Sequence, residues 1–268
     1  SGTLVWQRVT NKELAASRTA GTTIAVAGTV VVLSGMVLAW PNPASIVPAA
    51  LFNFVVFTAL AVLLELPIAH LFAAGCFVLG YLVSYHVIAG HIYWQNLRVT
   101  SLLGVMTTVS SGQALAAIFL LFIGLAEGLT RKGRTLDSQS YLVAACVAAA
   151  FSLILVTVYG ANVDSDPHFV WCFYLLYAAG AFWISWRNQA EVFGWIGSGL
   201  LLFSFVQALG LWLGLNTPWQ SASLAHASVC AIAAIVCSRY ERAGSTLARP
   251  LNLSALVISF LVIWLLMF

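Results

Sequence analysis

The sequence predicts an all-α fold, a polytopic transmembrane helix bundle of about nine spans with the N-terminus cytoplasmic and the C-terminus outside. Three observations predict it. Hydrophobic residues make up 62% of the 268 and charged residues 7%, against about 25% charged in a soluble domain. Long apolar runs recur from Thr22 to Phe268. Lysine and arginine gather on one side of the resulting topology. This composition excludes a secreted disulfide scaffold, a disordered tail and a nucleic-acid-binding domain.

The boundaries of the spans follow from length and from helix breakers. A spanning helix needs about 20 apolar residues. Pro41, Pro43 and Pro48 bracket the first turn between spans, and Glu65 with Pro67 makes a tight second turn. The predicted spans are residues 22–40, 47–64, 67–89, 106–128, 140–159, 168–185, 192–214, 222–238 and 251–268.

Two segments lie outside this repeating pattern. Residues 92–111 form the one long stretch between spans, and we expect it to lie along the outer interface or to start the fourth span as a tilted helix. Residues 1–21 are a polar cytoplasmic segment without the features of a signal peptide, and residues 22–268 make a single transmembrane domain. Because the chain begins with Ser1, we expect a processed chain, a tag remnant or part of a longer protein.

The distribution of lysine and arginine supports the span count and the orientation. Of the 11 such residues, Arg98 alone falls on the outer side. The others fall on the inner side: Arg8, Lys12, Arg18, Arg131, Lys132, Arg134, Arg187, Arg239, Arg242 and Arg249. Short cytoplasmic loops carry this excess of positive charge, and one missed span would move the later charges across the membrane. We expect a multi-pass protein of a bacterial inner membrane that contacts the lipid bilayer and other membrane subunits, but no nucleic acid.

The histidines are the residues most suggestive of chemistry, because most lie in the outer halves of the predicted spans with two carboxylates nearby. Such groups can ligate a haem, a chlorin or a metal ion. The candidate cofactor ligands are His86, His168 and His226, and the candidate metal ligands are His91, Asp164 and Asp166. Spacing gives no support, since His86 and His91 are five residues apart and helix neighbours are three or four apart. Asp166 before Pro167 also fits an ordinary helix N-cap. No particular cofactor is indicated.

Polar residues at mid-span are the next candidates. Asn53, Gln113 and Gln207 need hydrogen-bond partners across helices. They either hydrogen-bond neighbouring helices together or line a pore. His70 lies near the inner side, where we expect it to pack without a second ligand at its depth.

No motif indicates an enzyme. The sequence contains no phosphate loop, zinc signature or dinucleotide fingerprint, and its five cysteines lie within apolar runs without a CxxC pair. An intramembrane serine hydrolase would need Ser198 and His226 within hydrogen-bond reach. We expect these two residues at different depths and therefore apart. All eight carboxylates lie in loops or near span ends, which disfavours a proton pump.

These observations favour a non-enzymatic subunit or scaffold of a larger membrane assembly. The expected partner surface lies on the eighth and ninth spans. The eighth carries a stripe of small residues, Ala222, Ala227, Ala231 and Ala234, which allows close helix contact. One alternative is a transporter or channel for a weakly charged or apolar solute. The other is a haem- or pigment-binding redox protein that uses the outer histidines.

Overall fold

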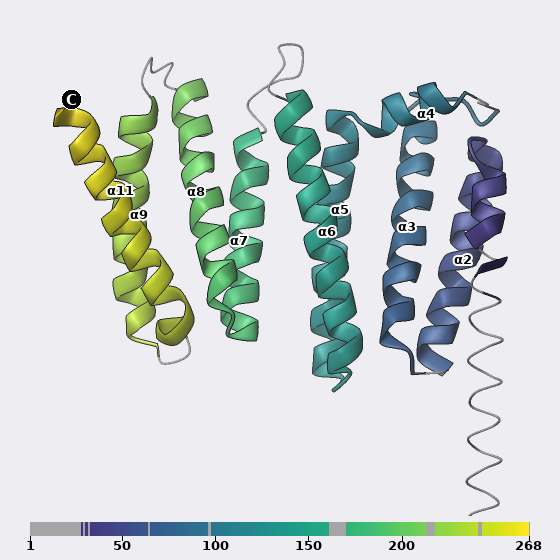
Figure 1. Cartoon of the computed structure of the whole chain (residues 1–268), viewed down its shortest axis with the longest axis horizontal. Helices are drawn as coiled ribbons and strands as arrows, with labels where there is room; N and C mark the ends of the chain where they lie inside the picture. The colour runs from purple at the N-terminus through teal and green to yellow at the C-terminus, as the bar shows by residue number, and fades with distance from the viewer. Residues whose placement is uncertain are drawn as a thin grey trace, which may run out of the picture. The chain divides into compact units, whose positions relative to one another are not determined.

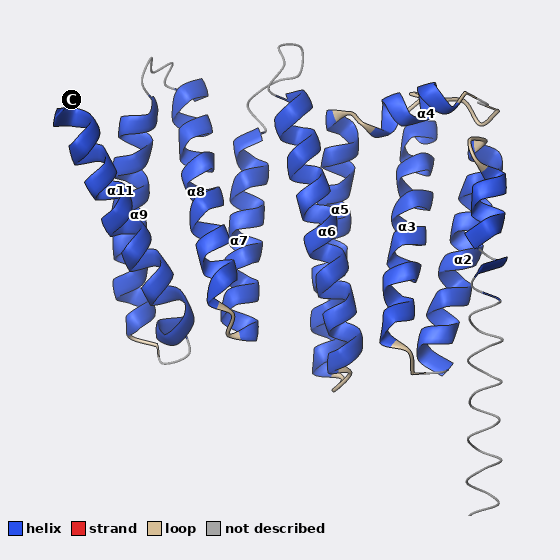
Figure 2. Cartoon of the chain, viewed as in Figure 1, coloured by secondary structure: helices blue, strands red, loops and turns tan. Residues whose placement is uncertain are grey.

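The computed structural model describes residues 28, 30–31, 33–63, 65–95, 98–160, 170–212, 218–240 and 243–267. Every regular element within these ranges is a helix, and none is a strand (Figure 2). Seven of the helices are long and apolar enough to cross a membrane. The prediction of an all-α fold is therefore confirmed for the described residues, and these seven helices have the length and composition to span a membrane.

The helices follow the predicted spans closely. They are α2 Pro43–Leu63, α3 Pro67–Ile88, α4 Val99–Met106, α5 Val109–Arg131, α6 Thr135–Gly160, α7 Val170–Asn188, α8 Glu191–Trp212, α9 Pro218–Ser238, the π-helical turn η2 Gly244–Ala248 and α11 Arg249–Met267. Part of the long stretch at residues 92–111 forms the separate short helix α4. Its C-cap is Thr107, and α5 begins two residues later at Val109.

The count of nine spans stays a prediction. The seven helices with spanning length and hydropathy are α2, α3, α5, α6, α8, α9 and the run from η2 into α11. Helix α7 occupies the place of the predicted sixth span but is not one of these seven. Most of the predicted first span, residues 22–40, lies outside the described residues, as do residues 1–21. The side on which each terminus lies and the bacterial inner membrane also stay predictions.

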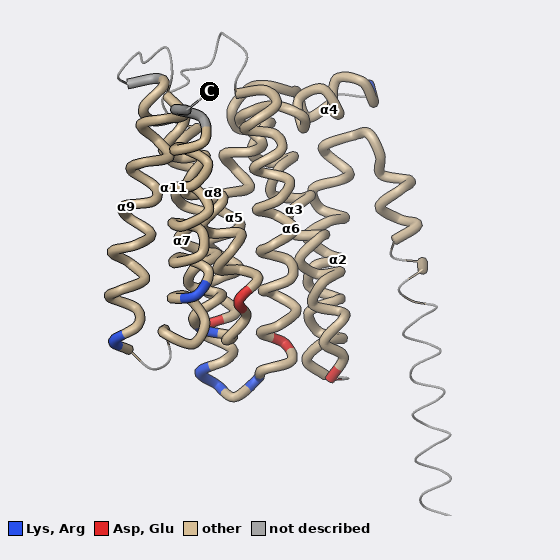
Figure 3. The backbone as a smooth tube through the Cα atoms, turned by 60° about the vertical axis from the view of Figure 1, so that its left-hand side comes forward, with Lys and Arg blue, Asp and Glu red and all other residues tan. Residues whose placement is uncertain are grey.

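The chain forms two compact units, Ser1–Ala148 (unit 1) and Ala149–Phe268 (unit 2), divided inside α6. In unit 1, α3 packs along α2 and also contacts α4 and α5 (Figure 1). In unit 2, α8 packs against α7 and α9, and α11 packs against α9 and α8. Charged residues of the described chain lie near helix ends and not at mid-helix (Figure 3).

Within the described ranges, four helices end in a Schellman-type turn, in which the residue after the C-cap takes the left-handed conformation. At α3 and α5 that residue is a glycine, Gly90 with φ 76° and Gly133 with φ 78°. At α2 and α7 it is Glu65 with φ 53° and Gln189 with φ 54°. The closing bonds join Leu66 N to Ala61 O (3.2 Å), His91 N to His86 O (2.9 Å), Arg134 N to Leu129 O (3.0 Å) and Ala190 N to Ser185 O (3.2 Å).

The alanine stripe of α9 faces the inside of unit 2. Ala222, Ala227 and Ala234 are buried. Ala234 belongs to a core cluster of unit 2, and the half-buried Ala231 packs against it. That cluster also contains Leu201, Leu247, Leu251 and Ala255 from α8, η2 and α11. The prediction that this stripe is a partner surface is therefore wrong. The small side chains let the helices of unit 2 approach closely, while large residues such as Ile232 and Ile235 are exposed.

A second close approach, between α7 and α8, leads to a stability prediction. A Cβ atom added at Gly197 would lie 2.8 Å from the Phe182 ring and 3.1 Å from the carbonyl oxygen of Ala178, whereas one added at Gly199 meets nothing within 4 Å. We expect Gly197→Ala to lower the free energy of unfolding by about 1–3 kcal/mol, the cost of overpacking. Gly199→Ala, on the same helix, should be neutral or slightly stabilising. Thermal unfolding in detergent measures both, and equal Tm values for the two variants would show that the contact at Gly197 is not tight.

Candidate functional site

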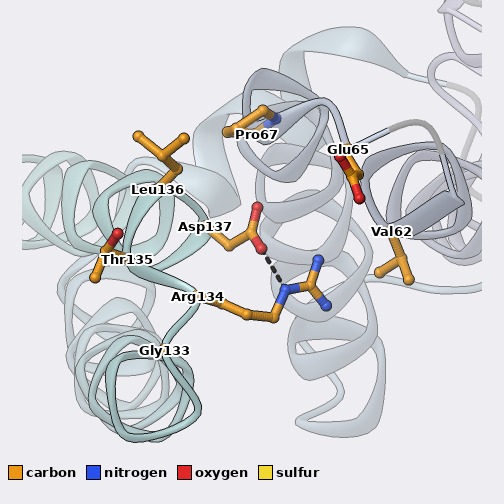
Figure 4. Close-up of a pocket in the computed structure, with 8 residues that line it drawn as sticks. All are labelled: Val62, Glu65, Pro67, Gly133, Arg134, Thr135, Leu136 and Asp137. Carbon is orange, nitrogen blue, oxygen red and sulfur yellow. Dashed lines mark ion pairs between the residues drawn. The ribbon is translucent and has the colours of Figure 1, made fainter.

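A cavity lined by charged residues lies in unit 1, at the end where α2 turns into α3 and α5 turns into α6. It has a volume of about 400 Å³ and is called here the Glu65 pocket (Figure 4). Its lining residues are Val62, Glu65, Pro67, Gly133, Arg134, Thr135, Leu136 and Asp137. The volume falls within the range of about 300–1,000 Å³ typical of small-molecule sites.

The two turns place the charged side chains of the pocket. Glu65 stands at the left-handed position that ends α2, where an L-residue costs about 1–2 kcal/mol. A glycine would remove that cost, so the presence of a carboxylate there favours a functional reason. Gly133 makes the corresponding turn after α5 without strain, and Arg134 follows it directly.

Arg134 and Asp137 form an ion pair inside the pocket. Arg134 Nε lies 2.6 Å from Asp137 Oδ2, and the two side chains are 38% and 10% exposed. Figure 4 shows the side chains of Glu65, Asp137 and Arg134 bordering the same space. The pocket thus offers the guanidinium of Arg134 and the carboxylate of Glu65. The Glu65 carboxylate forms no ion pair with a described residue.

His70 of α3 lies behind this pair, where it is 4% exposed. Its Nε2 atom is 3.4 Å from Asp137 Oδ1, within ion-pair distance. The angles do not make a hydrogen bond, and neither ring nitrogen has a hydrogen-bond partner in the described structure. The ring centroids of His70 and Tyr141 lie 5.2 Å apart. The prediction that His70 has no second group at its depth is wrong, because α6 begins at Thr135 and so carries Asp137 in its buried first turn.

Two of the predicted outer ligands meet at the opposite end of α3. His86 Nδ1 lies 2.9 Å from His91 Nδ1, and His86 Nε2 lies 2.7 Å from Ser111 Oγ. The spacing of five residues between His86 and His91 seemed unfavourable for two ligands of one site. The Schellman turn at Gly90 brings residues with this spacing close together. Gly90 was the sequence signal for this contact.

The remaining ligand assignments stay predictions. Asp164, Asp166 and His168 lie outside the described residues. His226 belongs to unit 2 and His86 to unit 1. Over the described residues, no group of three or more His, Cys, Asp and Glu is placed to hold a metal ion.

Ser198 and His226 form a buried polar cluster in unit 2 together with Ser254. Ser198 Oγ lies 3.3 Å from His226 Nε2 and donates to Ser254 Oγ at 2.6 Å, and Ser254 Oγ lies 3.0 Å from His226 Nε2. The expectation that Ser198 and His226 stay apart is wrong. Helix α9 begins at Pro218 and not at residue 222, so His226 lies about two turns inside its helix and reaches the depth of α8 and α11.

The three predicted mid-span polar residues have different surroundings. Asn53 of α2 is buried, Gln113 of α5 is exposed and Gln207 of α8 is half-buried in unit 2. This arrangement does not favour a common lining by Asn53 and Gln113, and a pore built from all three stays a prediction.

Comparison of the chain with protein-family models, with curated proteins and with solved structures finds no match.

Proposed function

We propose that the chain is a membrane transport protein that binds a small zwitterionic solute, with the size and charge of an amino acid, in the Glu65 pocket. One observation carries this proposal: a charged cavity of about 400 Å³ at the end of helices that are long and apolar enough to cross a membrane. Ionisable residues in or beside membrane spans usually mark solute or ion pathways, because their burial in hydrocarbon is costly.

Opposite charges in the pocket match the two ends of such a solute. The planar guanidinium of Arg134 binds a carboxylate through paired N–H groups, and its ion pair with Asp137 uses Nε. The carboxylate of Glu65 then binds the ammonium group of the solute. Arg134 and Glu65 are the proposed binding residues.

Asp137 and His70 have a different part in this proposal. Asp137 holds the guanidinium by its Oδ2 atom and faces His70 with its Oδ1 atom. An uncompensated charge at this depth would be costly. Arg134 supplies the compensating charge for Asp137, and the buried His70 ring limits where the carboxylate can lie. We assign Asp137 and His70 as positioning residues for Arg134.

The subunit and redox roles predicted from sequence remain open as alternatives with less support. The alanine face of α9 that favoured a subunit is used within unit 2. The described residues place only His86 and His91 of the predicted ligands side by side.

Uptake into liposomes tests the transport role. The purified full chain is reconstituted, loaded with unlabelled amino acids, and exposed outside to a tritium-labelled amino acid mixture. We expect counterflow accumulation of label above that of protein-free liposomes. Accumulation equal to that of protein-free liposomes would contradict the proposal.

A further inference from the structure

The ring nitrogens of His86 and His91 lie within hydrogen-bond distance of each other, and one of the two Nδ1 atoms donates to the other. Their Nδ1 atoms face each other at 2.9 Å. His86 is fully buried in α3, whereas His91 is exposed just after the helix end. One imidazole is therefore fixed and the other is open to ions from outside the unit.

The backbone holds the two rings in this relation. His91 N donates to His86 O at 2.9 Å and Gly90 N donates to Val87 O at 3.1 Å, which are the two bonds of a Schellman motif. Gly90 has a φ of 76°, so the turn needs no strained side chain. The two Cα positions are thus set by hydrogen bonds and not by contact between the rings.

The contacts of Ser111 favour a proton on Nε2 of His86. Its Oγ–H donates to the carbonyl of Val105 at 3.1 Å, so its oxygen accepts from His86 Nε2–H at 2.7 Å. This arrangement satisfies both contacts of Ser111 and leaves a lone pair on His86 Nδ1, facing His91. Metal-binding histidines have the same feature, a second ring nitrogen that donates to a fixed acceptor and orients the ring.

The separation of the two nitrogens is that of a hydrogen bond, and it also suits one arrangement of metal ligands. With metal–nitrogen bonds of about 2.0 Å, two donor atoms 2.9 Å apart subtend an angle of about 93° at the metal. A tetrahedral centre, with angles of about 109°, would need about 3.3 Å between them. Right angles between nitrogen ligands are typical of square-planar copper(II) and nickel(II).

We propose that the Nδ1 atoms of His86 and His91 form a chelating site for a divalent copper-type cation, copper(II) or nickel(II), at the end of α3 opposite the Glu65 pocket. On binding, the metal replaces a ring proton between the two Nδ1 atoms, and no change of oxidation state is required. The proposed site has two protein ligands, and solvent supplies the others. This site is independent of the proposed transport role.

Copper(II) titration of the purified full chain, prepared without a histidine tag, tests the site. We expect one strongly bound equivalent with an electron paramagnetic resonance spectrum of two equatorial nitrogens. His91→Gln should leave at most one of these nitrogens and weaken binding by at least about tenfold, since even changes around metal ligands cost about 10- to 100-fold. His91 is exposed, so this variant should fold even if His86→Gln does not.

Tyr93→Phe is the matched control, because Tyr93 is an exposed aromatic residue two positions from His91 and supplies no nitrogen. It should bind copper as the original chain does. Failure of the original chain to bind copper, or equal affinity and nitrogen count in the His91→Gln variant, would overturn the proposal.

Discussion

Replacing Arg134 with glutamine is expected to weaken solute binding in the Glu65 pocket by about 10- to 150-fold. Hydrogen bonds to a charged group contribute about 1.5–3 kcal/mol, and each 1.4 kcal/mol is a factor of ten in affinity. Glutamine keeps a donor near Asp137 but loses the charge and the planar fork. The concentration dependence of amino acid uptake into liposomes measures the effect. Arg134→Lys, which keeps the charge alone, should fall between the original chain and Arg134→Gln.

Arg131→Gln is the control for this experiment. Arg131 also forms an ion pair through Nε, at 2.9 Å from Glu127, but its side chain is 76% exposed and does not line the pocket. Such exposed pairs contribute about 0–1 kcal/mol, and uptake should be unchanged. Equal losses of uptake in Arg131→Gln and Arg134→Gln would show that the effect is a general one of charge at this end of unit 1.

Replacing His226 with alanine is expected to lower the free energy of unfolding by about 2–4 kcal/mol. His226 of α9 is almost fully buried and contacts Ser198 of α8 and Ser254 of α11. Hydrogen bonds between membrane helices average only about 0.6 kcal/mol. Most of the loss therefore comes from the cavity that the ring leaves and from the hydroxyl groups of Ser198 and Ser254, which lose His226 as a hydrogen-bond partner.

Ser228→Ala provides the comparison on the same helix. Ser228 is exposed and donates to Leu224 O within α9, so its removal should change stability by less than about 0.5 kcal/mol. Unfolding in detergent, followed by temperature or denaturant, measures both variants. A His226→Ala protein as stable as Ser228→Ala would mean that the buried cluster does not hold the three helices together.

The helices were the most predictable part of the structure. Apolar runs of spanning length and prolines at the turns place most of them within a few residues, because both signals are local in the sequence. The alanine stripe shows where local reasoning stops. Its residues are small enough for close packing, but nothing in the sequence says whether the neighbour is another subunit or a helix of the same unit. In unit 2 the neighbours are α8 and α11.

The site residues were harder to predict because each depends on where a helix begins or ends. His86 and His91 meet through the turn at Gly90, a contact that helical periodicity alone does not predict. Asp137 reaches His70 because α6 starts at Thr135. The left-handed conformation of Glu65 has no signal in the sequence, since glycine is the residue expected at such a position.

Uptake by a Glu65→Gly variant, measured beside its thermal stability, tests the transport role most directly. Glycine removes a strain of about 1–2 kcal/mol and adds an entropy cost of about 0.5–1 kcal/mol, so the variant should be as stable as the original chain or slightly more stable. Gln189→Gly removes the same kind of strain at the end of α7, away from the pocket, and should keep full uptake. We predict that Glu65→Gly folds and reconstitutes normally but accumulates no more label than protein-free liposomes, because the partner of the ammonium group is gone. Full uptake by a stable Glu65→Gly protein would contradict the assignment of the Glu65 pocket as the solute site.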